Sequence, residues 1–155
     1  MDDWNALARA LRTLHAALLR RARAQWVWDQ GKTDDEVGPG ELLMLATRDE
    51  SFAWLRSLSE LMTEIDELRD SPEATQDTSL RAAVRTTIED LLAAPAEGES
   101  PTPFQERYWR HVRAEPEVTM AHAAVRQALA AWPRGGTGRS LMETHLQNVR
   151  KGPPS

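Results

Sequence analysis

The segment of residues 51–70 constrains the fold more than any other part of this sequence. Its apolar side chains recur alternately four and three positions apart, at Trp54, Leu58, Leu61, Ile65 and Leu68. That spacing places all five on one face of an α-helix. An apolar face of this length has to be covered by other helices, so the segment predicts a helix inside a helical assembly.

Three further segments carry the same helical spacing. Residues 2–29 and 78–94 each predict one long helix, and a fourth helix is expected over residues 104–132. Pro116 lies inside this last segment and predicts a break, because proline removes a backbone donor and restricts the residue before it. Glycine and proline mark residues 31–40 as a connection.

The composition supports helices and one core. Alanine (22 residues) and arginine (17) are abundant and favour helices, and no segment shows the alternation of a β-strand. A chain of 155 residues is short for two independent cores. We therefore predict an all-α, single-domain antiparallel helical bundle of four main helices plus one or two short helices. The bundle is assigned to residues 1–132, and residues 133–155 to a Gly/Pro-containing tail with a short helix at 140–150.

Composition also excludes several classes of protein. The chain has no cysteine, which excludes disulfide frameworks, thiol catalysis and cysteine-ligated metals. Its first residues are acidic, unlike those of a signal peptide, and no run of 18 apolar residues occurs. We expect a cytoplasmic protein with no membrane partner.

Two stretches carry a resemblance to other proteins. They are residues 52–61 (FAWLRSLSEL), followed by Ile65-Asp66-Glu67, and residues 120–124 (MAHAA). With these stretches the chain resembles a group of small uncharacterised bacterial all-helical proteins, over most of its length. The resemblance implies an all-helical fold and assigns no activity and no site residue.

Catalytic and metal-binding motifs are missing from the sequence. There is no Glu-x-x-His pair of the di-iron bundles and no His-Glu-x-x-His of the zinc proteases. There is also no phosphate-binding glycine loop and no Gly-x-Ser-x-Gly turn. We expect a non-enzymatic protein with no catalytic residue, no metal and no cofactor.

Three histidines lie beside the predicted apolar faces and have two interpretations. As structural residues, His15, His111 and His122 would be bonded to backbone or carboxylate partners in the core. As functional residues, they would line a ligand pocket together with Asp66, which borders the apolar stripe of residues 51–70. A buried carboxylate in such a pocket would have a raised pKa.

Several tryptophans and arginines fit no single buried face. Tryptophan and arginine are enriched at the energetic centres of protein interfaces. Nucleic acid is disfavoured as a partner, because the net charge is -5 and the pI about 5.4. The candidate interface residues are Trp26, Trp28, Trp109, Arg107, Arg110 and Arg113.

Charge is also segregated along the chain. Residues 30–79 hold 4 basic and 13 acidic groups, whereas residues 1–29 and 104–155 carry net charges of +2 and +4. These groups would neutralise each other within one chain, across a dimer or with a partner. We predict an interaction or regulatory protein that acts through a protein partner or self-association. The alternative is a small-molecule-binding bundle with an apolar pocket lined by tryptophan and histidine.

Overall fold

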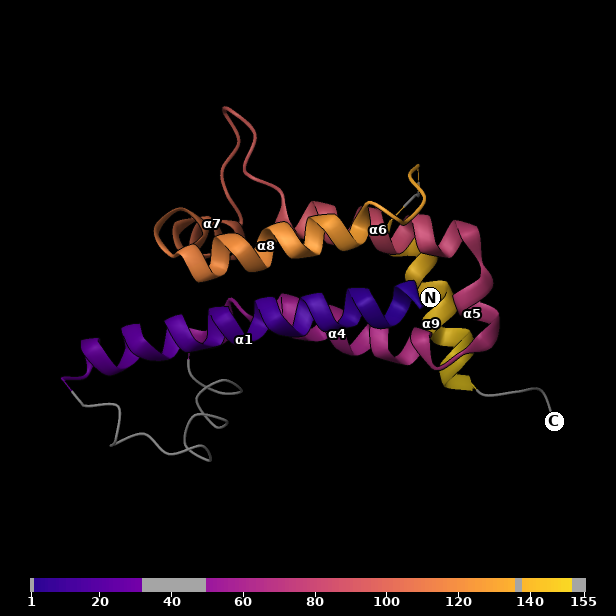
Figure 1. Cartoon of the computed structure of the whole chain (residues 1–155), viewed down its shortest axis with the longest axis horizontal. Coiled ribbons are helices and arrows are strands. Elements are labelled where there is room, and N and C mark those ends of the chain that lie inside the picture. The colour runs from indigo at the N-terminus through magenta and orange to yellow at the C-terminus, as the bar shows by residue number, and fades with distance from the viewer. Residues whose placement is uncertain (1, 32–49, 136–137, 152–155) are drawn as a thin grey trace.

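The computed structural model describes residues 2–31, 50–135 and 138–151, and within these ranges its regular structure is helical. The prediction of an all-α fold is therefore confirmed for the described part of the chain. The predicted connection at residues 31–40 lies, beyond Gly31, outside it. The helices, labelled as in Figure 1, are α1 (Asp3–Asp29), α3 (Glu50–Ala53), α4 (Arg56–Arg69), α5 (Pro72–Gln76), α6 (Thr78–Leu92), α7 (Pro103–Ala114), α8 (Pro116–Leu129) and α9 (Arg139–Lys151).

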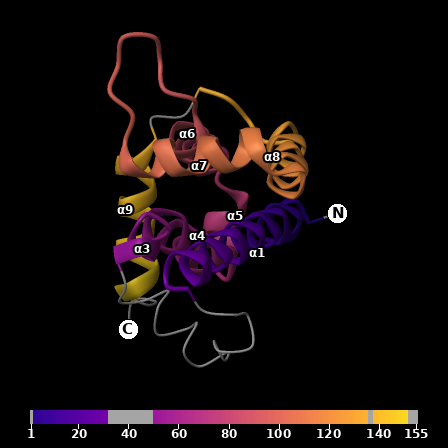
Figure 2. The same cartoon turned by 90° about the vertical axis from the view of Figure 1, so that its left-hand side faces the viewer.

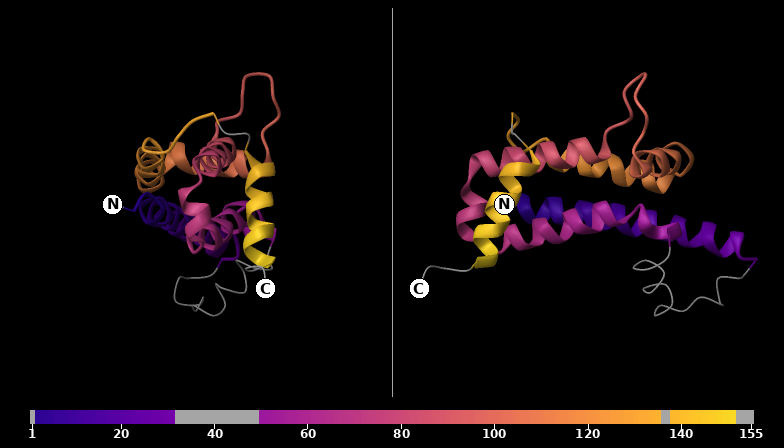
Figure 3. Two further views of the ribbon diagram at one scale, coloured as in Figure 1. Left: turned by 90° about the vertical axis from the view of Figure 1, so that its right-hand side faces the viewer. Right: turned by 180° about the vertical axis from the view of Figure 1, so that it is seen from behind.

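The long helices lie in two layers. Helices α1 and α4 pack side by side in one layer, and α6 and α8 lie in the other (Figures 1 and 2). The most extensive contact between two helices joins α1 to α8. Helix α7 packs against α8 and α6 at one end, and α9 runs across both layers at the other end, against α4 and α6 (Figure 3).

The apolar stripe of residues 51–70 faces the core, as the sequence predicts. Leu58, Ile65 and Leu68 are fully buried, and Leu61 and Trp54 are almost so. Burying an aliphatic side chain contributes roughly 1.5–3 kcal/mol, so this stripe supplies a large share of the stability.

The stripe is not one helix, however, and this part of the prediction is wrong. The chain turns at Trp54 and Leu55, between α3 and α4, where the Leu55 amide donates to the Phe52 carbonyl at 3.0 Å. Trp54 and Leu55 are both buried at this turn, so the apolar stripe continues through the break.

Local sequence signals account for several helix ends. The Asp2 carboxylate accepts from the amides of Trp4 (3.0 Å) and Asn5 (3.3 Å), and so caps α1. The break expected at Pro116 is confirmed, because Glu115 is extended between α7 and α8. Helix α8 ends at Leu129, three residues before the predicted end, and Trp132 folds back into the core.

Helix α9 occupies Arg139–Lys151, where the sequence suggests a short helix. Its apolar side chains Met142 and Leu146 belong to the same core as the other helices. Arg139 pairs with Glu64 at 2.7 Å and Arg150 pairs with Glu67 at 2.8 Å. Apolar burial and ion pairs together therefore hold α9 against the rest of the fold.

None of the helices in the described ranges has the length and apolar character needed to cross a bilayer.

Candidate functional site

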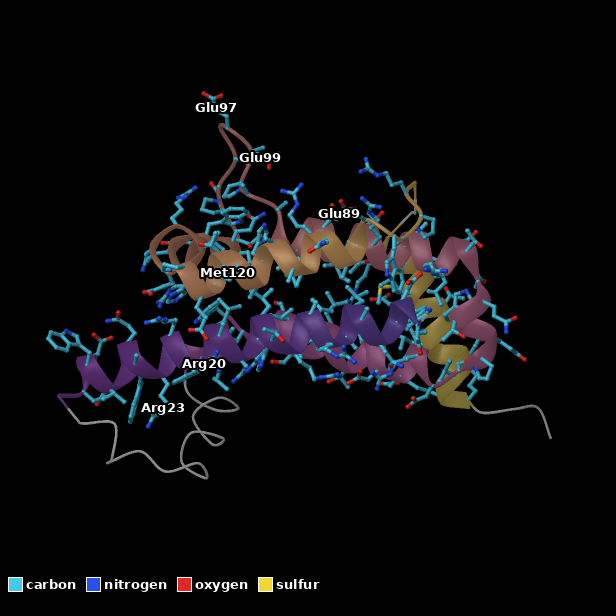
Figure 4. All side chains as sticks on the ribbon, viewed as in Figure 1. Arg20, Arg23, Glu89, Glu97, Glu99 and Met120 are labelled. Atoms are coloured by element: carbon cyan, nitrogen blue, oxygen red, sulfur yellow. The ribbon has the colours of Figure 1, made fainter. Side chains whose placement is uncertain are left out.

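A cleft of about 670 Å³ lies between α6, α7 and α8, and we call it the α6–α8 cleft. Leu92 and Leu129 form part of its apolar lining. Glu89, on the outward side of α6 in Figure 4, lies at its border. The connection that bears Glu97 and Glu99 projects away from the helices (Figure 4). The cleft is therefore a concave surface formed mainly by residues of three helices.

Two rings of the cleft wall are held in fixed positions. The Trp109 indole Nε1 donates to the Leu92 carbonyl at 3.2 Å. The same indole meets the His122 ring edge to face, with centroids 5.2 Å apart. Behind them, Tyr108 contacts both rings. This wall is preformed, because each ring has partners that restrain its rotation.

A partly buried hydrogen bond determines which nitrogen of His122 carries the proton. The Tyr108 hydroxyl lies 2.5 Å from His122 Nδ1. Burial raises the pKa of Tyr108, so this group is a neutral phenol that can donate. Burial and then the charge of Arg126 lower the pKa of His122, so the ring is neutral near pH 7. With Nδ1 accepting from the tyrosine, we assign the ring proton to Nε2.

Three guanidinium groups also line the cleft. Arg85 is only 6% exposed; its Nη1 donates to the Trp132 carbonyl at 2.6 Å and its Nε to Glu89 at 3.1 Å. Arg126 and Arg134 form no ion pair within the part of the chain that the structure describes. The cleft thus sets three positive groups against one negative group, in a chain whose net charge is -5.

Of the predicted pocket residues, only His122 lines this cleft. His111 stacks on Trp54, with ring centroids 5.7 Å apart. His15 lies between α1 and α4, where its Nε2 is 2.9 Å from the Ser59 hydroxyl. Burial is the main cause that lowers the pKa of both histidines. Their contacts are those of structural residues in separate places.

Asp66 also lies away from the cleft. Its carboxylate is about half exposed and pairs with Arg69, one turn along α4, at 3.4 Å. Among the described residues, no three His, Asp or Glu side chains gather as a metal ion would require. Ser59, the partner of His15, donates its hydroxyl to the Leu55 carbonyl at 3.2 Å. Asp66 is therefore a surface carboxylate. Its ion pair with Arg69 does not connect it to the histidines of the predicted pocket.

The predicted interface tryptophans do not share one surface. Trp26 is buried in the core, whereas Trp28 is 81% exposed. Trp109 is partly buried in the cleft wall, where the sequence had suggested a protein contact. Trp28 is thus the one tryptophan of the three that presents a large apolar surface to solvent.

The predicted arginine triplet lies on the exposed side of α7. Arg107 and Arg113 are exposed and form no ion pair within residues 2–31, 50–135 and 138–151. Arg110 pairs loosely with Glu106, one turn earlier, at 3.5 Å. Exposed pairs of this kind contribute roughly 0–1 kcal/mol.

Part of the charge segregation is neutralised within the chain. Arg20 pairs with Glu117, and Arg21 with Glu115 at 3.3 Å, which joins basic α1 to the start of α8. The acidic α4 pairs with basic α9 through Glu64 and Glu67, as described above. These ion pairs support neutralisation within one chain, the first of the three alternatives for the segregated charge.

Comparison with known proteins adds no residue roles. No family model, no curated protein and no solved structure matches this chain. The resemblance to small bacterial helical proteins stays a prediction.

Proposed function

We propose that this chain is a non-enzymatic protein that binds a small molecule in the α6–α8 cleft. One observation carries the proposal: a cleft of about 670 Å³ whose aromatic wall, Trp109 and His122, is already fixed by hydrogen bonds and ring contacts. Small-molecule sites typically have volumes of about 300–1,000 Å³, with aromatic walls and a few placed polar groups. This is the second of the two functions that the sequence suggests.

The arrangement of the long helices supports a stable frame for such a site. We propose that α1, α4, α6 and α8 act as the predicted antiparallel four-helix bundle, with the cleft on its outer edge. In Figure 1, α1 runs from the N-terminus toward the end where α7 lies, α4 returns, and α6 and α8 again run in opposite directions. The cytoplasmic location expected from the sequence stays a prediction.

The test fills the cleft with a side chain. Ala130 is exposed and lines the cleft, so Ala130→Trp would obstruct it. Ala124 is also exposed, on α8, which ends just before Ala130, and it does not line the cleft, so Ala124→Trp is the matched control. Saturation-transfer NMR would follow three planar probes, namely indole, adenosine and adenosine 5′-monophosphate. Circular dichroism would check that both variants remain helical.

We expect at least one probe to bind the parent chain and Ala124→Trp, and to lose its signal with Ala130→Trp. If no probe binds, or if Ala130→Trp binds as the parent does, the proposed function is wrong. Indole and adenosine are uncharged and adenosine 5′-monophosphate is an anion, but all three have a flat ring, so any of them reports on the aromatic wall.

A second candidate function is the protein contact that the sequence favours. We propose that Trp28 is the centre of a contact with a second copy of this chain or another protein. The support is its 81% exposure, because an exposed tryptophan is a large apolar surface and tryptophan is enriched at interface centres. Exposed charges around such a contact would be screened by salt, so the association should weaken as salt is added.

Light scattering over a range of protein and salt concentrations tests the self-association form. Trp28→Ala should weaken association at least fivefold, while Met120→Ala, at a residue 73% exposed, should leave it unchanged. A strict monomer under all conditions would exclude self-association, and would leave only a different protein as partner.

A further inference from the structure

The α6–α8 cleft differs in charge from the rest of the molecule. The whole chain carries 24 acidic and 19 basic residues, yet the cleft holds Arg85, Arg126 and Arg134 against Glu89 alone. Like charges that share a concave site repel one another, and a bound anion relieves that repulsion. The lining of the cleft therefore has an excess of positive charge.

Arg85 provides a fixed charge in this site. Its side chain is more than nine-tenths buried, and its Nε and Nη1 are held by Glu89 and by the Trp132 carbonyl. Glu89 is about half exposed, so water weakens its neutralising effect. A buried cation with an incomplete counter-charge makes a positive potential that is already present before any ligand arrives.

Arg126 and Arg134 provide two further positive charges, with no ion-pair partner in the described part of the chain. Arg126 lies on α8 and Arg134 follows the end of that helix. Each guanidinium presents a flat fork of donors that matches the oxygens of a phosphate or carboxylate group. The two side chains line the same cleft as Trp109.

We infer that the α6–α8 cleft takes a planar organic phosphomonoester, with its phosphate on Arg85, Arg126 and Arg134 and its flat ring against Trp109. The inference rests on the proposed function and names the class of ligand for it. A phosphomonoester carries a charge of roughly -1.5 to -2 at pH 7, which matches the excess of two positive groups in the cleft. A flat ring packs well against an indole, and arginine adds to such contacts.

The experiment separates the anionic part of the ligand from the planar part. Calorimetric titrations at low salt would compare adenosine 5′-monophosphate, adenosine and inorganic phosphate. Adenosine 5′-monophosphate should bind at least tenfold tighter than either of the others. Arg126→Met and Arg134→Met should each reduce that advantage about tenfold. Arg113→Met is the matched control, because this arginine is also exposed and unpaired in the described chain but lies outside the cleft.

Each contrary result has a distinct meaning. If adenosine binds as tightly as its monophosphate, the charge inference is wrong while the cleft remains a binding site. If inorganic phosphate binds as tightly as adenosine 5′-monophosphate, the inferred contact of a flat ring with Trp109 is wrong. The inference is also overturned if adenosine 5′-monophosphate keeps its tighter binding in both cleft variants, or loses it in Arg113→Met. Either result would mean that the phosphate binds elsewhere. If neither nucleoside compound binds, the ligand class is wrong, and indole in the cleft-filling experiment then decides whether the proposed function is wrong as well.

Discussion

Replacing Leu58 with alanine tests the packing on which the whole arrangement depends. Leu58 is fully buried in the core, on the face of α4 that carries the apolar stripe. The change removes three carbon atoms, which corresponds to about 2.4 kcal/mol of transfer free energy at roughly 0.8 kcal/mol per group. A residual cavity adds to this, so we expect Leu58→Ala to lower the free energy of unfolding by about 3–4 kcal/mol.

Urea unfolding followed by circular dichroism measures this loss. The midpoint should fall while the slope stays constant, because the change removes packing without altering the surface exposed on unfolding. Met120→Ala serves as control, because Met120 is 73% exposed and its loss should cost less than about 0.5 kcal/mol. If Leu58→Ala costs no more than the control, the described packing of α4 is wrong.

Two further predictions concern ion pairs and pH. Arg139→Ala should lower the free energy of unfolding more than Arg150→Ala in the same assay. The reason is that Glu64 would be left buried without its partner, whereas Glu67 is more exposed. Equal losses would contradict this prediction. Burial lowers the pKa of His15 and His122 below the ordinary 6.5, so below pH 6.5 the unfolded chain binds more protons and stability falls. Melting temperatures at pH 7.5 and 5.5 check this, and the fall should shrink when both histidines are replaced by glutamine; an unchanged fall would refute the assignment.

Helices and their buried faces were predictable because their signals are local. The spacing around Leu58 and Ile65 fixes one face of a helix, and Pro116 disfavours a helical conformation at Glu115 before it, which separates α7 from α8. The turn at Trp54 and Leu55 has no such signal. The turn depends on how these two side chains pack against other helices, and neighbouring positions in the sequence do not encode that packing.

The cleft was harder to predict because it is assembled from distant segments. The sequence pattern indicated Trp109 and His122 as candidate site residues, but it did not indicate the three arginines that line the same cleft. For Arg85 a signal existed: it lies three positions before the buried Ile88, at the edge of an apolar helix face. A charged residue at such a position needs a partner inside the fold. For Arg126 and Arg134, only the position of α8 across the cleft from α6 supplies the reason.

The pairing of α1 with α8 also bears on how the chain reaches its structure. The ion pair of Arg20 with Glu117 joins residues 97 positions apart, so the main helix contact is remote in sequence. Remote contacts slow folding relative to helical proteins built from adjacent hairpins. At synthesis rates of roughly 5–20 residues per second, α8 leaves the ribosome about 5–20 s after the partner residues of α1. During that interval α4 can cover only part of the apolar face of α1, and the rest is a surface that a chaperone would recognise.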